Sequence, residues 1–139
     1  MHQLKDLMSR DVKVIGPEMS IREAATQMSA GDFGMMPVGT VDGLIGTISD
    51  RDIAIRAVAL GKGPETKVRD VMSEGVSSVN ESDTVEQAVK LMSEHQVRRL
   101  PVVDKDKRLV GIVALGDLAV KDSESRPAAQ ALAEISKPS

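Results

Sequence analysis

The chain has 139 residues, a formal net charge of −3 at pH 7 and no cysteine. These numbers exclude disulfides, thiol catalysis and cysteine-ligated metals, and the acidic balance argues against a nucleic-acid partner, which selects basic surfaces. The residues are 41% hydrophobic but include a single aromatic, Phe33, so the core must be aliphatic and rich in the 8 methionines.

The first half of the chain predicts a strand, a helix, a β-hairpin and a second helix, in that order. The strand is expected over 12–15, the hairpin strands over 36–41 and 44–48, and the closing helix over 50–60. Ser20 marks the start of the first helix, because Glu23 three residues later completes a capping box. The spacing of this helix's apolar residues predicts one buried face, formed by Ile21, Ala24, Ala25 and Met28.

The second half predicts the same order of elements. The strand is expected over 76–79, the hairpin strands over 100–103 and 109–114, and the closing helix over 115–120. Thr84 and Gln87 form the second capping-box pattern. The buried face of this helix is predicted to contain Val85, Ala88, Val89 and Met92.

An internal repeat explains this recurrence. At an offset of 64 residues, Asp6-Leu7-Met8-Ser9 aligns with Asp70-Val71-Met72-Ser73 and Pro37-Val38 with Pro101-Val102. One extra residue in the second turn then shifts the offset to 65, so that Asp52 aligns with Asp117. Such a repeat indicates supersecondary units that cannot each bury their apolar face alone.

The repeat divides the chain into four segments. We expect repeat 1 over 1–60, a linker over 61–68, repeat 2 over 69–122 and a tail over 123–139. Pro127 predicts a short amphipathic helix in the tail that ends near Ile135. That helix is either loosely docked on the chain or packed against a partner subunit.

Catalytic machinery is absent from the sequence. Of the two histidines, His2 lies at the terminus, and His95 ends a predicted helix, where a cation favours the helix dipole. No nucleophile motif, phosphate-binding glycine loop or HExxH pattern is present. We therefore expect no catalytic residues, no metal site, no required cofactor and no enzyme activity.

The junction between the first hairpin and its following helix is the best candidate for binding. Free backbone N–H groups at such a junction attract anions, Ser49 adds a hydroxyl, and the carboxylate of Asp52 suits two adjacent sugar hydroxyls. The alternative is that Asp52 only places a favourable charge at a helix start. In the second repeat the same positions are Ala114 and Asp117, so the hydroxyl is lost.

Arg98 and Arg99 precede a predicted strand and offer donors for a phosphate. The alternative is a solvated strand edge, where charges discourage aggregation. The first repeat has the uncharged Gly34-Met35 at this place. The two repeats therefore differ at the positions expected to touch an anion.

These residues together resemble a tandem pair of CBS domains, a Bateman module of the kind found in stand-alone bacterial proteins. The resemblance covers residues 4–121 and lies in the paired Met-Ser segments, the Met-Pro-Val and Leu-Pro-Val strands, and the junctions at Gly46–Asp52 and Gly111–Asp117. It implies an α/β (α+β) fold of two β-α-β-β-α repeats, packed through their sheets with pseudo-twofold symmetry. No apolar run is long enough to span a membrane, so we expect a cytoplasmic protein.

The resemblance also implies two ligand clefts, each formed by both repeats. The better cleft is expected to contain Ile48, Ser49, Asp52, Asp83, Ala88, Val97 and Arg98, with Arg99 pointing toward the centre. The weaker cleft is expected to contain Met19, Ala24, Phe33, Gly34, Val113, Ala114 and Asp117. In the better cleft Asp52 would hold the ribose, Ser49 and Arg98 the phosphate, and Val97 the adenine edge.

The function implied is a regulatory module that binds AMP, ADP, ATP or S-adenosylmethionine and signals through an unidentified effector or its own dimer. CBS pairs commonly form disc-like homodimers of four repeats, which we expect here. The alternative is an interaction module whose clefts have degenerated and bind nothing.

Overall fold

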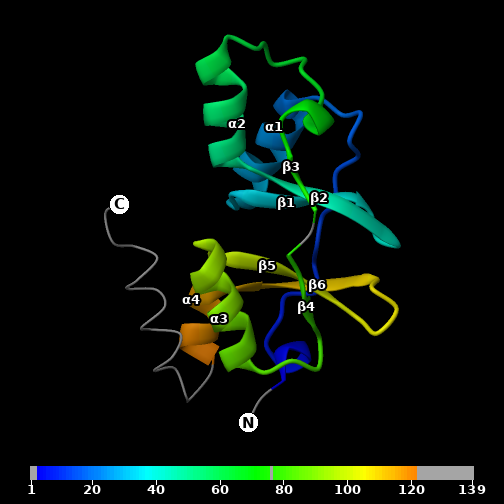
Figure 1. Ribbon diagram of the computed structural model, residues 1–139, viewed down its shortest axis with the longest axis vertical. Helices are drawn as coiled ribbons and strands as arrows, with labels where there is room; N and C mark the ends of the chain where they lie inside the picture. Colours follow the sequence, from blue (N-terminus) through cyan, green and yellow to red (C-terminus); the bar gives the residue numbers. More distant parts are fainter. Residues whose placement is uncertain (1–2, 76, 122–139) are drawn as a thin grey trace. The chain divides into compact units, whose positions relative to one another are not determined.

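The computed structural model describes residues 3–75 and 77–121, which form a mixed α/β chain (Figure 1). The chain folds into two compact units. The first-repeat unit spans Lys13–Val76, and the second-repeat unit combines Met1–Val12 with Ser77–Ser139. The helix predicted from Pro127 lies outside the described residues.

The first-repeat unit is built on a three-stranded antiparallel sheet in the order β1-β2-β3. Its elements are α1 (Ile21–Gly31), β1 (Met35–Thr40), β2 (Gly43–Ser49), α2 (Asp50–Arg56), two 3₁₀ turns (Val58–Leu60 and Val68–Asp70) and β3 (Ser73–Glu74). The closing helix predicted to reach residue 60 therefore ends at Arg56 and continues as a 3₁₀ turn.

The second-repeat unit also has a three-stranded sheet, in the order β4-β5-β6, but its third strand, β4, precedes the first helix of the unit. Its elements are a 3₁₀ turn (Leu4–Asp6), β4 (Val79–Asn80), α3 (Val85–His95), β5 (Arg99–Val103), β6 (Leu109–Ala114) and α4 (Leu115–Lys121). β4 lies parallel to β5, and β5 and β6 form the predicted antiparallel hairpin. No helix among the described residues is long and apolar enough to traverse a lipid bilayer.

The strand predicted over 12–15 is not formed. Ile15 alone makes a bridge, donating its N–H to the Pro37 carbonyl oxygen at 3.0 Å. Two features prevent a longer ladder. The chain passes from one compact unit to the other after Val12, and Pro17 has no N–H to donate.

Both central helices begin at the predicted residues. The Glu23 N–H donates to Ser20 Oγ at 3.1 Å, which caps α1. The Gln87 N–H donates to Thr84 Oγ1 at 3.2 Å, and the Thr84 N–H donates to Gln87 Oε1 at 2.8 Å, which completes the capping box of α3. In α1 the Glu23 carboxylate instead accepts from Gln27 Nε2 at 3.1 Å.

We expect Thr84→Ala to lower the free energy of unfolding by about 1 kcal/mol, because an N–H at the start of α3 loses its acceptor. Thr84→Ser keeps the hydroxyl and is expected to remain close to the wild type. Urea denaturation of the two variants measures the difference. Equal losses in both would show that the hydroxyl does not cap the helix.

Each unit has its own aliphatic core. The first-repeat core contains Ile15, Ile21, Ala24, Met28, Met36, Val38, Ile48, Ala57, Val68 and Val71. The second-repeat core contains Leu4, Leu7, Met8, Val79, Val85, Ala88, Val89, Met92, Leu100, Val102, Val113, Leu115 and Leu118. The predicted buried face of α3 is confirmed. On α1 the prediction for Ala25 is wrong, because this residue is exposed.

The two Met-Ser segments occupy equivalent places in the two units. Ser73 pairs with Thr47 as part of β3, and Ser9 forms an antiparallel bridge with Ile112 on β6. The segment that opens repeat 1 in the sequence is thus built into the second-repeat unit. In the same way, the segment that opens repeat 2 completes the sheet of the first-repeat unit.

Candidate functional site

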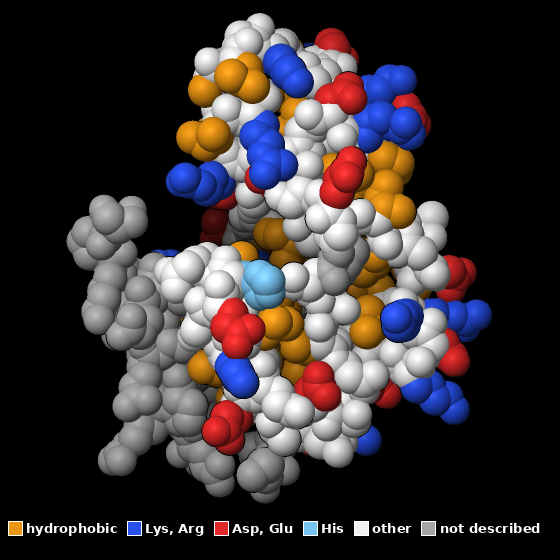
Figure 2. Space-filling model, in the orientation of Figure 1, with side chains coloured by type: hydrophobic (Ala, Val, Ile, Leu, Met, Phe, Trp, Pro, Cys, Tyr) orange, Lys and Arg blue, Asp and Glu red, His pale blue; other side chains and the backbone are white. Residues whose placement is uncertain are grey.

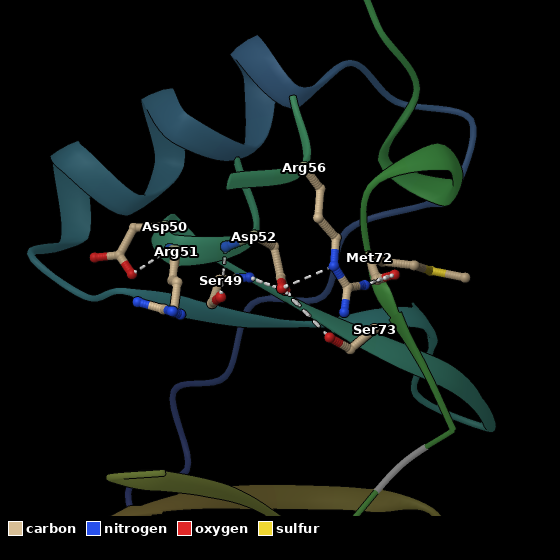
Figure 3. A network of polar contacts seen from close by, with 7 residues as sticks. All are labelled: Ser49, Asp50, Arg51, Asp52, Arg56, Met72 and Ser73. Atoms are coloured by element: carbon tan, nitrogen blue, oxygen red, sulfur yellow. Dashed lines mark hydrogen bonds and ion pairs between the residues drawn. The ribbon is translucent and has the colours of Figure 1, made fainter. Parts of the chain in front are cut away.

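The junction between β2 and α2 holds Ser49 and Asp52 in a reciprocal capping box (Figure 3). The Asp52 N–H donates to Ser49 Oγ at 3.0 Å, and the Ser49 N–H donates to Asp52 Oδ2 at 3.0 Å. The sequence places both residues correctly at the helix start. Both side chains also cap the helix, which agrees with the alternative interpretation of Asp52 as a residue that stabilises the helix start.

Asp52 is further engaged from β3 and from the end of its own helix. The Ser73 hydroxyl donates to both carboxylate oxygens, with Oγ 3.4 Å from Asp52 Oδ1 and 3.5 Å from Oδ2. Arg56 Nε lies 4.0 Å from Asp52 Oδ1, and Arg56 Nη1 donates to the Met72 carbonyl oxygen at 3.0 Å. The Asp52 side chain is 14% exposed, so these contacts hold a half-buried carboxylate that still reaches the surface.

Gly34 lies against the start of α2. Its carbonyl oxygen accepts from the Asp50 N–H at 2.9 Å, and a Cβ at this position would lie 2.9 Å from Asp50 Oδ2. A side chain at Gly34 would therefore require the Asp50 carboxylate to move. Nearby in sequence, Phe33 packs on the first-repeat core. Met19 is 45% exposed, whereas Ala24 is fully buried.

The second-repeat junction shows the same backbone contact. The Leu115 N–H donates to the Arg98 carbonyl oxygen at 2.8 Å, as Asp50 does to Gly34 in the other unit. Arg99 pairs with Ala114 in the β5–β6 ladder. Asp117 is exposed in the first turn of α4 and accepts no hydrogen bond within the described part of the chain.

The remaining predicted residues divide between surface and core. Asp83 Oδ2 accepts from the Asn80 N–H at 2.9 Å, and Val97 is 36% exposed. The side chains of Ile48, Ala88 and Val113 are buried in the cores of their own units. The structure brings Ser49 together with Asp52. The predicted clefts combine residues of both units, and those combinations stay predictions.

Within residues 3–75 and 77–121, no three histidine or acidic side chains gather as a metal site.

The CBS domain family matches the chain twice, over residues 4–58 and 68–124. The chain belongs to the CBS domain family. The two matches correspond to the two repeats, so the protein carries a tandem CBS pair.

A relative of similar length matches nearly the whole chain. The CBS domain-containing protein YhcV of Bacillus subtilis is 44% identical over 136 residues, which are 98% of this chain and 96% of YhcV. Two CBS proteins of solved structure were crystallised with ligands. The CBS pair of protein MJ0100, in complex with 5′-methylthioadenosine and S-adenosyl-L-methionine, is 27% identical, with a TM-score of 0.78 over 87% of this chain and 95% of that one. CBSX2, in complex with AMP, is 26% identical, with a TM-score of 0.74 over 99% and 100%.

Sequence reasoning missed Arg56 and Ser73 as neighbours of Asp52. Arg56 lies four residues after Asp52, a helical spacing that favours ion pairs and was a usable signal. The sequence signal for Ser73 was weaker and consisted only of its place in the repeated Met-Ser segment. No local pattern indicated that this segment forms β3 beside β2.

Proposed function

We propose that this CBS pair is a non-catalytic regulatory module that binds an adenosine-containing ligand, with Asp52 as its ribose acceptor. The observation that carries the proposal is the oriented, partly exposed carboxylate at the β2–α2 junction. AMP in CBSX2, and 5′-methylthioadenosine and S-adenosyl-L-methionine in the CBS pair of MJ0100, support the ligand class. AMP, ADP, ATP and S-adenosylmethionine are the candidates.

In the proposed cleft, Asp52 accepts the two ribose hydroxyls, Ser49 and Arg98 lie on the phosphate side, and Val97 lines the adenine edge. Asp83, Ala88, Ile48 and Arg99 complete the predicted set. The second cleft, around Asp117, lacks the hydroxyl at Ala114 and a cation at Gly34. Each missing bond to a charged phosphate costs roughly 1.5–3 kcal/mol, so this cleft is weaker, empty or takes an uncharged adenosyl group.

A thermal-shift panel of AMP, ADP, ATP and S-adenosylmethionine tests the proposal. A ligand at 100 times its dissociation constant is expected to stabilise the folded protein by about 2.7 kcal/mol, because it binds the native state alone. GMP at matched concentration is the control for nonspecific phosphate binding. If no adenosyl compound raises the melting temperature, the module belongs to the alternative class, an interaction module without a ligand.

The proposed assembly is a homodimer. Three large apolar side chains beyond the core of the first-repeat unit, Ile55, Val58 and Leu60, are 52%, 68% and 68% exposed. Figure 2 shows hydrophobic side chains on the outer side of α2. An apolar cluster of this kind favours contact with a second copy, and a two-fold interface is the commonest arrangement.

We expect Val58→Glu to convert the dimer into a monomer, because two buried charges would face each other across a two-fold contact. Light scattering after size-exclusion chromatography measures the mass. Ser29→Glu, on the exposed side of α1, is the matched control and is expected to leave the mass unchanged. A wild-type protein with the mass of one chain would contradict the dimer. Location in the cytoplasm stays a prediction.

A further inference from the structure

The Asp52 carboxylate has two kinds of neighbour, and they differ in how they hold it. Ser49 belongs to the same helix start and uses Oδ2. Ser73 comes from β3 and lies at 3.4 and 3.5 Å from the two oxygens, at the fork of the carboxylate. These distances exceed the usual O–H···O range, so the Ser73 hydroxyl makes a weak contact that is shared between the two oxygens.

Arg56 connects the carboxylate to the same segment of chain. Its guanidinium donates to the carbonyl oxygen of Met72, the residue before Ser73, and lies 4.0 Å from Asp52 Oδ1. Figure 3 shows Arg56 and Ser73 on the side of Asp52 that faces β3. At 4.0 Å the guanidinium supplies charge rather than a hydrogen bond to Asp52.

The acceptor positions left on Asp52 match a ribose. A carboxylate offers about four lone-pair positions. The Ser49 N–H and the shared Ser73 hydroxyl occupy two of them, and Oδ1 carries most of what remains. A 2′,3′-diol donates two hydrogen bonds, so the count of free acceptors equals the count of ligand donors.

The second repeat provides a comparison within the same chain. Ser9 is the repeat equivalent of Ser73 and pairs with Ile112 through the backbone in the same way. Asp117, the equivalent of Asp52, nevertheless accepts no hydrogen bond from a described residue. The backbone plan is thus shared, and among the residues that the structure describes the side-chain contacts to this carboxylate occur in the first-repeat unit.

We propose that Ser73 and Arg56 are positioning residues that orient the Asp52 carboxylate for a vicinal diol, and that they thereby set the preference of the site for ribose over deoxygenated sugars. This inference rests on the proposed function. It adds that the recognition of the sugar depends on β3. This strand is the last element of the first-repeat unit, which ends at Val76.

The test compares AMP with 2′,3′-dideoxy-AMP by isothermal titration calorimetry. The wild type is expected to prefer AMP roughly tenfold or more, since its carboxylate accepts bonds from the diol. Ser73→Ala and Arg56→Gln are each expected to reduce that preference at least about threefold, through weaker binding of AMP and unchanged binding of the dideoxy compound. Ser73→Thr, which keeps the hydroxyl, is expected to restore it.

Two controls and three outcomes make the test decisive. Ser29→Ala and Arg22→Gln change exposed residues of α1 and are expected to keep the wild-type preference, and circular dichroism confirms that each variant is folded. An unchanged preference in Ser73→Ala and Arg56→Gln overturns the inference and leaves the proposed function standing. Equal weakening of both nucleotides also overturns it, because a purely structural role acts on both. If the wild type binds neither nucleotide, the proposed function fails and the inference fails with it.

Discussion

Asp52→Ala is expected to weaken the binding of AMP by about tenfold to a hundredfold, whereas Asp117→Ala is expected to change it less than about threefold. The reason is the difference in preorganisation between the two carboxylates. Asp52 accepts from the Ser49 N–H at 3.0 Å, has the Ser73 hydroxyl at 3.4 Å and is 14% exposed. Asp117 is exposed and accepts no hydrogen bond from the described residues, so it gives a ligand no oriented acceptor.

The pair of variants controls for helix effects. Both residues lie in the first turn of a short helix, where a carboxylate contributes about 0.3–1 kcal/mol to helix stability. Asp52 also belongs to a capping box, so Asp52→Asn serves as a third variant that keeps the side-chain shape. Calorimetric titration well below the melting temperature separates binding from folding. Loss of AMP binding in Asp117→Ala with retention in Asp52→Ala would reverse the assignment of the two clefts.

Gly46→Val is expected to produce the largest loss of stability of any substitution proposed here, at least about 2 kcal/mol. A Cβ at Gly46 would run into the carbonyl oxygen of Ser73 on the neighbouring strand, which is backbone and cannot rotate away. The branched side chain therefore forces β2 and β3 apart. Because β3 carries Ser73, the same substitution is expected to abolish the preference for the ribose diol.

Gly111 is the repeat equivalent and has the same constraint. A Cβ there would lie 2.8 Å from the Ser9 carbonyl oxygen and 2.6 Å from Met8 Sδ. Gly111→Val is therefore expected to destabilise the second-repeat unit in the same way. Gly116→Ala is the control, because a Cβ at Gly116 meets no atom of the described residues within 4 Å and alanine is a better helix former. Urea denaturation would contradict this account if Gly46→Val were no less stable than Gly116→Ala.

The elements with strong local signals were predicted well from the sequence. Ser20 and Thr84 start their helices as expected, and the two hairpins lie close to their expected bounds, because capping and turn chemistry act over a few residues. The strand expected over 12–15 is reduced to one bridge at Ile15. The chain passes from one unit to the other after Val12, inside the expected strand, and no local pattern indicates that change.

For a related reason, the sequence did not predict that each Met-Ser segment pairs with the sheet of the other repeat. Ser9 and Ser73 are repeat equivalents, so the sequence is equally consistent with either one completing either sheet. The structure places Ser9 beside β6 and Ser73 beside β2. For the site, the helix-start residues Ser49 and Asp52 were predictable. The tertiary contact of Ser73 with Asp52, which spans 21 residues of sequence, was not.

A crystal structure of the wild-type protein with AMP tests the central claim most directly. We predict density for the nucleotide beside the β2–α2 junction, with both ribose hydroxyls within hydrogen-bond distance of the Asp52 carboxylate and the phosphate toward Arg98. A nucleotide bound through Asp117 alone, with the Asp52 carboxylate in contact only with Ser49, Ser73 and Arg56, would contradict the account.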